Sequence, residues 1–161
     1  MLKEMIYKQG ELAKQAARRL AVASEEQKNQ ALLTMAEELR RNESEIIAAN
    51  KLDLQEGENK GLSKALLDRL LLNSARIADM AKGLEAIAAL PDPIGEVTSM
   101  WKSSGLQIGK VRVPLGVVGI IYESRPNVTV DAAGLCLKTS NATILRGGSE
   151  AFRTNSAICS I

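Results

Sequence analysis

The chain has 161 residues, of which 45% are hydrophobic but only 2% aromatic. We therefore expect one domain with a core of aliphatic side chains. The 21 basic and 19 acidic residues leave a net charge of +2, which is too small to indicate binding to nucleic acid or to a membrane surface. The chain contains no histidine, so the commonest general base and transition-metal ligand are missing, and no metal site is expected.

The two cysteines, Cys136 and Cys159, lack the C-x-x-C spacing of redox and metal sites. This usage is typical of a reducing compartment, and we expect the protein to be cytoplasmic. No run of about 18 apolar residues occurs, so no membrane-spanning helix is predicted. Segment 1–19 is basic and amphipathic but contains Glu4 and Glu11, and we interpret it as a surface helix rather than a transit peptide.

Residues 1–93 are predicted to be helical, because apolar side chains recur there at helical spacing. The residues expected to face the core from the first two helices are Ile6, Leu12, Ala13, Ala16, Ala17 and Leu20, then Leu32, Leu33, Met35, Ala36 and Leu39. The expected N-terminal caps are Ser24 in a capping box with Gln27, then Asn42, Ser63 and either Asn73 or Ser74. Gly57 and Gly61 are expected to bracket a break between helices, and the prolines at positions 91 and 93 to end the helical part.

Residues 94–161 change to patterns typical of strands. Segments 97–102 and 106–113 are predicted to form an antiparallel hairpin around a turn at 103–105. Residues 115–122 are instead continuously apolar and rich in β-branched side chains. That composition favours a parallel strand buried on both faces.

A βαβ unit is predicted in the last third of the chain. The order of its parts is strand 117–122, turn 123–127, a helix, strand 142–145 and turn 146–150. Asn127 or Thr129 is expected to open its helix, and Ser149 to cap a last helix. Both turns follow the carboxyl ends of parallel strands, which is where α/β folds bind their ligands.

Several strings of the sequence resemble the aldehyde dehydrogenase superfamily. PLGVVG at residues 114–119, followed by Pro126-Asn127, is similar to the superfamily as a whole. Two longer strings, YESRPNVTVDAA at 122–133 and ILRGGSEA at 144–151, resemble one branch, the γ-glutamyl phosphate reductases. AANKLDL at 48–54 and LLDRL at 66–70 resemble the same branch, so the resemblance covers essentially the whole chain.

This resemblance implies a reaction, namely the NADPH-dependent reduction of L-glutamate 5-phosphate to glutamate 5-semialdehyde with release of phosphate, in proline biosynthesis. A cysteine thiolate attacks the acyl phosphate, and hydride then reduces the thioester. Both steps place negative charge on the carbonyl oxygen, so a hydrogen-bond donor fixed beside it lowers the barrier. The implied partners are this substrate, glutamate 5-kinase by association within the family, and a second copy of the chain joined through residues 97–113.

The resemblance also implies roles for the first turn of the βαβ unit. Asn127 aligns with the superfamily asparagine whose amide forms part of the oxyanion hole, and an amide donates a hydrogen bond there without titrating. Arg125 and Pro126 are expected along the cofactor, with Arg125 also able to face an anionic group of the substrate. On the residues alone, Asn127 is equally well explained as a helix cap, and the two roles are compatible.

The second turn carries the other expected cofactor-binding residues. Arg146 stands where the superfamily has a lysine beside the adenosine ribose, and a guanidinium there can pair with a 2′-phosphate, which favours NADP over NAD. Gly147 and Gly148 stand where many relatives have a single proline, and Ser149 and Glu150 are expected to bind near the ribose. On the residues alone, Arg146-Gly147-Gly148 is also explained as a strand-to-helix turn without a role in cofactor binding.

Neither cysteine is placed as the nucleophile of the family. Cys136 lies in an apolar helical pattern and is interpreted as a small core residue, and Cys159 falls in the last helix. The resemblance thus implies a single, incomplete NADP-binding domain at residues 1–161, the amino-terminal portion of such an enzyme, catalytically inactive alone. Its expected parts are residues 1–93, mainly helical, and residues 94–161, with the hairpin and the βαβ unit.

The fold expected overall is α/β, with amino-terminal helices packed on an incomplete parallel Rossmann-like sheet and the antiparallel hairpin at its edge. A sheet with so few strands leaves an edge and apolar faces uncovered, so we expect low solubility or partial disorder, most of all in the last helix. Two other functions stay open. One is a non-catalytic helical interaction module, and the other is an intact small dinucleotide-binding protein, against which the missing G-x-G-x-x-G fingerprint speaks.

Overall fold

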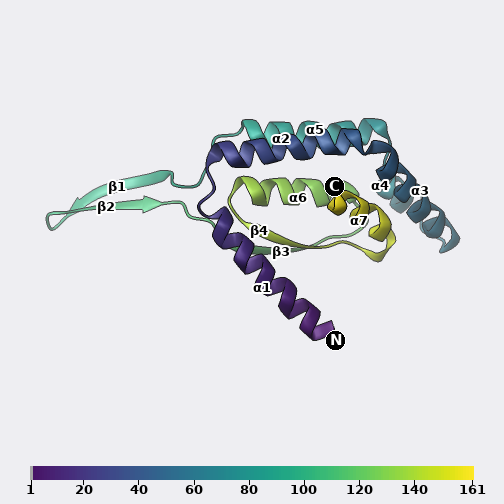
Figure 1. Cartoon of the computed structure of the whole chain (residues 1–161), viewed down its shortest axis with the longest axis horizontal. Coiled ribbons are helices and arrows are strands. Elements are labelled where there is room, and N and C mark those ends of the chain that lie inside the picture. Colours follow the sequence, from purple (N-terminus) through teal and green to yellow (C-terminus); the bar gives the residue numbers. More distant parts are fainter. Residues whose placement is uncertain (1) are drawn as a thin grey trace.

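The computed structural model describes residues 2–161 as a body of helices that holds a small parallel sheet and carries a projecting hairpin (Figure 1). The elements follow in this order: α1 (Leu2–Leu20), α2 (Glu25–Arg41), α3 (Glu43–Asn59), α4 (Lys64–Leu70), α5 (Ser74–Ala89), β1 (Val97–Ser103), β2 (Leu106–Val111), β3 (Val117–Ile121), α6 (Pro126–Lys138), β4 (Ala142–Arg146), a 3-10 turn η1 (Ser149–Ala151) and α7 (Phe152–Ser160). The predicted α/β class is confirmed. None of the helices in this described part is long and apolar enough to cross a membrane.

The elements stack in layers (Figure 1). α2 and α5 lie side by side as the outer layer, α6 lies between this pair and the β3–β4 sheet, and α1 contacts the sheet from its other side. The buried core gathers where α2, α5 and α6 meet, and its largest fully buried members include Leu32, Ile77 and Leu84. Truncating one such side chain to alanine is expected to cost about 2–5 kcal/mol of stability.

Local signals in the sequence fix the starts of three helices, α2, α4 and α5, as predicted. Ser24 Oγ accepts from the backbone N–H of Gln27, whose side chain accepts in turn from the N–H of Ser24, at 3.2 and 3.0 Å. Ser63 caps α4, and Asn73, rather than Ser74, caps α5. Each of these caps satisfies an N–H group that the first helical turn leaves without a partner.

Two expectations about α3 are wrong. Asn42 precedes the helix, but its side chain donates backwards to the carbonyl oxygen of Glu38 at 2.9 Å and makes no cap. Gly57 lies inside α3, where a Cβ atom would meet Leu62 Cδ1 at 2.8 Å. This glycine therefore serves close packing, and the break comes only at Gly61, which has φ of 74°.

The apolar stripe of α1 is not core, contrary to expectation. Of its six predicted core residues only Ala17 is buried, whereas Ile6 and Leu12 are 59% and 55% exposed. β4 and β3 are the neighbours of this helix, and its N-terminal half extends beyond them (Figure 1). The periodicity correctly predicted the helix, but burial needs a surface wide enough to cover it.

The parallel sheet consists of two strands. β3 pairs with β4 in a register that runs from Val117 opposite Ala142 to Ile121 opposite Arg146. The predicted burial of this strand on both faces is wrong, because Ile121 is 82% exposed. Within residues 2–161 no strand pairs with the other edge of β3, so its apolar composition matches a central strand while its place in the sheet is an edge.

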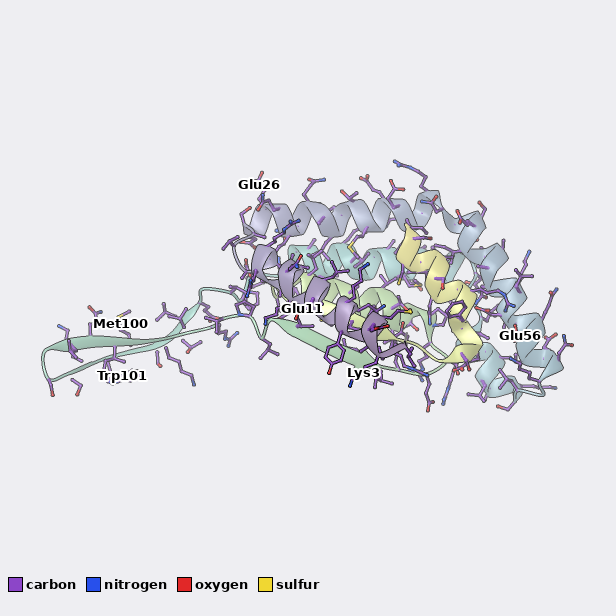
Figure 2. All side chains as sticks on the ribbon, turned by 60° about the horizontal axis from the view of Figure 1, so that its bottom comes forward. Lys3, Glu11, Glu26, Glu56, Met100 and Trp101 are labelled. Carbon is purple, nitrogen blue, oxygen red and sulfur yellow. The ribbon has the colours of Figure 1, made fainter. Side chains whose placement is uncertain are left out.

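The predicted hairpin is confirmed, but it forms a sheet of its own that is not hydrogen-bonded to β3 or β4. Ser104 and Gly105 form its turn with φ of 49° and 80°, as a two-residue hairpin loop with the favoured twist requires. Figure 2 shows Met100 and Trp101 on this ribbon, away from the helices. They are 57% and 49% exposed, so the hairpin adds little to the core.

Two buried lysines tie the helical layer to the rest of the fold. Lys28 Nζ donates to Asp92 Oδ2 and, at 3.0 Å, to Ser140 Oγ. Lys138 Nζ donates to the carbonyl oxygen of Ala88 at 3.0 Å. Both lysines are 2% exposed, and these contacts hold the ends of α5 and α6 against the start of α2.

Candidate functional site

The two turns of the βαβ unit lie next to each other at the carboxyl end of the sheet. The backbone N–H of Tyr122 donates to the carbonyl oxygen of Arg146 at 3.1 Å, which extends the pairing of β3 and β4 by one residue. The segments that follow each strand, from Glu123 and from Gly147, therefore start side by side. Ligands of open α/β sheets bind at this edge.

Ser124 and Glu150 connect the two turns. Ser124 Oγ donates to Glu150 Oε1 at 2.7 Å, and Ser124 is itself buried. This hydrogen bond is the main cause that lowers the pKa of the Glu150 carboxyl; hydrogen bonds from its own backbone and from Ser149 and the charge of Arg146 add to it, while burial opposes it. The site therefore presents an ionised carboxylate, which suits it to accept hydrogen bonds from hydroxyl groups.

Side chains of the following residues pack so closely on the two glycines after β4 that only glycine fits there. A Cβ atom at Gly148 would meet Glu150 Oε1 at 2.1 Å, and one at Gly147 would meet Asn155 Nδ2 at 2.2 Å. Both distances are far below ordinary contact, so any side chain there displaces Glu150 or Asn155. Glycine at both positions thus lets Asn155 and the Glu150 carboxylate pack directly against the backbone of this turn.

Arg146 directly precedes the two glycines, and its guanidinium is free for a ligand. Its side chain is exposed, and Nη1 donates only to the carbonyl oxygen of Gly147, at 3.3 Å. Among residues 2–161 no carboxylate forms an ion pair with it. A free guanidinium and an ionised carboxylate therefore lie on the same turn, and such groups can bind a phosphate and hydroxyl groups, respectively.

The first turn places its residues differently from the prediction. α6 begins at Pro126, with Arg125 as the residue before it, so neither Asn127 nor Thr129 is the cap. Proline suits the first helical position because its missing N–H has no partner there in any case. Asn127 lies in the first turn of α6, exposed, and its Nδ2 donates to Asp131 Oδ2 at 3.2 Å. Its amide therefore remains accessible to a substrate.

The last predicted cap is also wrong. Ser149 starts the short 3-10 turn η1, and α7 begins at Phe152 without a side-chain cap. Ser149 remains beside Glu150, where its hydroxyl helps to lower the pKa of that carboxyl. The residue thus belongs to the second turn, as expected, but not as a helix cap.

Two clefts share Arg125 and Arg69 in their walls. One has a volume of about 380 Å³ and is lined by Arg125, Asn127 and Asp131 of the βαβ unit together with residues of α4 and α5. The other, of about 270 Å³, is lined by Arg125, Ser124 and Arg69 among others. Asn127 thus lines only the first cleft and Ser124 only the second. Arg146 to Glu150 line neither cleft.

Sequence patterns did not indicate the polar contacts that support these turns. The Tyr122 hydroxyl and Thr129 Oγ1 are 2.5 Å apart, and Thr129 Oγ1 donates to Asn155 Oδ1 at 3.0 Å. Burial is the main cause that raises the pKa of the Tyr122 phenol. These contacts join β3, α6 and α7, and no local spacing in the sequence relates the three residues.

The cysteines do not take part in this arrangement. Cys136 is buried in α6, as predicted for a core residue. Cys159 lies in α7, and partial burial raises the pKa of its thiol, which disfavours the reactive thiolate. Within residues 2–161 no group of three or more potential ligands is placed to hold a metal ion.

Relatives of known name match nearly all of this chain. It is 66% identical over 150 residues to a γ-glutamyl phosphate reductase of Moorella thermoacetica, covering 92% of this chain and 36% of that protein. It is 58% identical over 161 residues to one of Syntrophomonas wolfei, covering 99% of this chain and 38% of that protein. No family model matches the chain.

Solved structures agree with these relatives. The crystal structure of a γ-glutamyl phosphate reductase from Thermotoga maritima superposes with a TM-score of 0.92 at 43% identity, covering 96% of this chain and 37% of that one. The enzyme of the same name from Saccharomyces cerevisiae gives a TM-score of 0.87 at 34% identity, covering 92% and 38%. The chain belongs to the γ-glutamyl phosphate reductase family, and it spans little more than a third of the length of the members it matches.

Proposed function

We propose that this chain supplies the adenosine-ribose side of an NADPH site and the oxyanion donor in the reduction of L-glutamate 5-phosphate to glutamate 5-semialdehyde. The relatives carry the name of that reductase. The single observation that best supports the proposal is the second turn of the βαβ unit, where the unpaired Arg146 guanidinium and the ionised Glu150 carboxylate, which packs on Gly148, lie together. We interpret residues 1–161 as one incomplete NADP-binding domain.

Each residue of the proposed cofactor site has a chemical task. The Arg146 guanidinium pairs with the 2′-phosphate of the ribose, and the carboxylate of Glu150 with the hydroxyl of Ser149 bind the sugar hydroxyls. Gly147 and Gly148 let Asn155 and Glu150 pack on the turn, which holds the Glu150 carboxylate in place for the sugar. Arg125 lies along the cofactor next to Pro126, which is itself buried. When bound, NADPH supplies the hydride for the reduction.

The Asn127 amide is proposed to donate to the carbonyl oxygen of the substrate as negative charge forms there. It is exposed, and its present acceptor, Asp131, is at 3.2 Å, so a stronger acceptor replaces this contact easily. Neither Cys136, buried in the core, nor Cys159, with its raised thiol pKa, suits the role of the nucleophile. We therefore infer that the chain alone has no reductase activity.

Two partner proposals go with this function. The exposed apolar hairpin β1–β2, with Met100 and Trp101, is proposed to pair with a second copy of the chain. Glutamate 5-kinase is proposed as a functional partner, because an acyl phosphate hydrolyses readily and gains from direct transfer. We place the reaction in the cytoplasm, where the reduced cysteines suit the compartment.

The proposed cofactor site is tested by titrating the purified chain with NADPH and with NADH, following nicotinamide fluorescence. We expect saturable binding, with NADPH preferred about tenfold because of the charge-assisted contact to Arg146. Arg146→Ala should abolish that preference, whereas Arg19→Ala, which removes an exposed guanidinium from α1, should retain it. Equal effects of the two substitutions would show that Arg146 acts only through net charge.

An absence of any binding to NADPH would contradict the proposal itself. It would favour the other function considered for this sequence, a helical interaction module. Exposed apolar residues on α1, including Met5 and Ile6 at 60% and 59% exposure, are the feature that such a module would use.

A further inference from the structure

The cleft lined by Arg125, Asn127 and Asp131 has a volume of about 380 Å³, which is within the range of small-molecule sites. The proposed cofactor residues Arg146 to Glu150 do not line it. Its walls come from α4, the loop after it, the N-terminal half of α5 and the first two turns of α6 with Arg125 before them. These elements bring together charged side chains of both signs.

Part of this charge is already neutralised within the walls. Arg76 donates to Asp68 Oδ1 at 2.9 Å and to the carbonyl oxygen of Leu71 at 2.7 Å. Asp79 accepts from Lys82 Nζ at 3.4 Å. These contacts hold the walls of the cleft in place and leave the paired groups less available to a ligand.

Three charged groups remain available to a ligand. The side chains of Arg69 and Arg125 are exposed and form no hydrogen bond or ion pair among residues 2–161. The carboxylate of Asp131 accepts one side-chain hydrogen bond, from Asn127. Two free guanidiniums and one carboxylate therefore line the cleft beside the proposed oxyanion donor.

We propose that this cleft binds the amino-acid end of the substrate, with Arg69 and Arg125 on the α-carboxylate and Asp131 on the α-ammonium group. The inference rests on the proposed function and adds recognition of the substrate to it. Guanidinium groups match the planar carboxylate, and a carboxylate accepts from an ammonium group in charge-assisted hydrogen bonds.

The spacing of the residues suits a chain as long as glutamate. The side-chain atoms Asn127 Nδ2 and Asp131 Oδ2 are 3.2 Å apart, and with a hydrogen bond of about 3 Å leading outward from each, the two ligand atoms that they bind can lie about 5 Å apart. The δ-carbonyl carbon of an extended glutamyl group lies roughly 5 Å from its α-ammonium nitrogen, given carbon–carbon bonds of about 1.5 Å. A ligand with its carbonyl at Asn127 thus places its ammonium group at Asp131, and this group replaces Asn127 as the partner of the carboxylate.

The test is an NMR titration of the whole 161-residue chain with L-glutamine, whose δ-amide carbonyl represents the reacting carbonyl. We expect saturable shifts at the backbone amides of Arg69, Arg125 and Asp131 and at the side-chain amide of Asn127. Glutaramic acid, which lacks the ammonium group, and 4-aminobutanamide, which lacks the carboxylate, should each bind about tenfold more weakly.

Variants show whether the named side chains are responsible. Arg69→Gln and the nearly isosteric Asp131→Asn should each weaken L-glutamine binding about tenfold. Arg18→Gln removes a charge from an exposed position on α1 and should leave it unchanged. NADPH binding, measured in the same samples, should not change in Arg69→Gln, which also shows that this variant is folded.

The outcomes separate this inference from the proposed function. NADPH binding without saturable L-glutamine shifts at the cleft overturns the inference alone. L-glutamine binding at the cleft without NADPH binding supports the inference and contradicts the cofactor proposal. Binding of neither overturns both. L-glutamine binding that Arg69→Gln and Asp131→Asn leave intact overturns the inference alone, because the ligand then lies elsewhere.

Discussion

At the scale of single residues, the fold depends on buried polar side chains that satisfy several partners at once. Asn50 is fully buried, and its Nδ2 donates to the carbonyl oxygen of Leu70 at 2.8 Å and to Thr154 Oγ1 at 3.2 Å. Its Oδ1 accepts from the backbone N–H of Leu72 at 2.8 Å. One side chain thus connects α3, the end of α4 and α7, and it explains an asparagine in the AANKLDL string.

Asn50→Ala is predicted to destabilise the chain by about 3 kcal/mol, because it leaves the buried N–H of Leu72 and the carbonyl of Leu70 without partners. Urea denaturation followed by circular dichroism measures the change in the free energy of unfolding. Asn59→Ala, at the exposed end of α3, serves as the control and should stay within about 0.5 kcal/mol of wild type. Similar losses in the two variants would show that the network contributes nothing specific.

Residue-level expectations succeeded where the partners are close in sequence. Ser24 and Gln27 form their capping box because both lie within one helical turn. The contact between Ser124 and Glu150 joins residues 26 positions apart, and only the pairing of β3 with β4 creates it. Asn127 was expected as a cap, but Pro126 starts the helix one residue earlier.

At the scale of elements, two helical glycines face different surroundings. A Cβ atom at Gly134 in α6 would meet Leu84 Cδ2 at 2.6 Å and Ile87 Cδ1 at 3.3 Å, whereas one at Gly83 in α5 would meet only Asp131 Oδ1, at 3.7 Å. Leu84 is 1% exposed and has little room to move. Gly134 therefore sets the close approach of α6 to α5.

Gly83→Ala is predicted to stabilise the chain by about 1 kcal/mol, the usual gain from replacing a helical glycine. Gly134→Ala should instead be destabilising, because overpacking costs typically about 1–3 kcal/mol and offsets the same gain. Thermal denaturation of the two variants compares them directly. A Gly134→Ala protein that melts at or above the temperature of Gly83→Ala would refute the tight α5–α6 contact.

Strand β3 is an element whose burial the amino-acid composition predicted wrongly. Its residues are those of a central parallel strand, and burial on both faces was expected, yet it has a neighbour on one side only. The same holds for α1, whose periodic stripe is largely exposed. A hydrophobic pattern indicates which face of an element is apolar. Whether that face is buried depends on neighbouring elements, which the pattern itself does not specify.

An uncovered apolar strand edge is expected to promote self-association of the chain. Ile121→Lys, at a side chain that is 82% exposed, should reduce concentration-dependent light scattering while leaving the unfolding free energy within about 0.5 kcal/mol of wild type. Leu106→Lys makes the matched change on the hairpin, at a residue that is 67% exposed. If only Leu106→Lys reduces scattering, the chain associates through the proposed hairpin interface alone, and the prediction for the β3 edge is wrong.

At the scale of the whole molecule, ion pairs make stability depend on pH. Hydrogen bonds from Lys60 and then Arg153 lower the pKa of Glu56 from 4.5 to about 2. For Asp92, burial raises the pKa, but the hydrogen bonds from Lys28 and the Ile94 amide outweigh it, so that the net shift is downward. A carboxyl group whose pKa is lower in the folded state stabilises the fold above its unfolded pKa and loses this effect as the pH falls through the folded value.

The free energy of unfolding is therefore predicted to be nearly constant from neutral pH down to about pH 5 and to fall between about pH 4.5 and pH 2. Urea denaturation over this range measures the profile. Lys60→Gln removes the first partner of Glu56, so its profile should fall less steeply. A wild-type profile that stays flat below pH 4.5, or one that the substitution leaves unchanged, would count against these ion pairs.

The central claim is that the carboxyl end of the β3–β4 sheet holds one side of an NADPH site, and mapping NADPH on the chain by NMR tests it most directly. The predicted result is saturable shifts of the backbone amides of Gly147, Gly148 and Ser149 and of the neighbouring Ser124, with the hairpin β1–β2 unaffected. Saturable shifts confined to the hairpin or to α1, or no shifts at all, would contradict the claim.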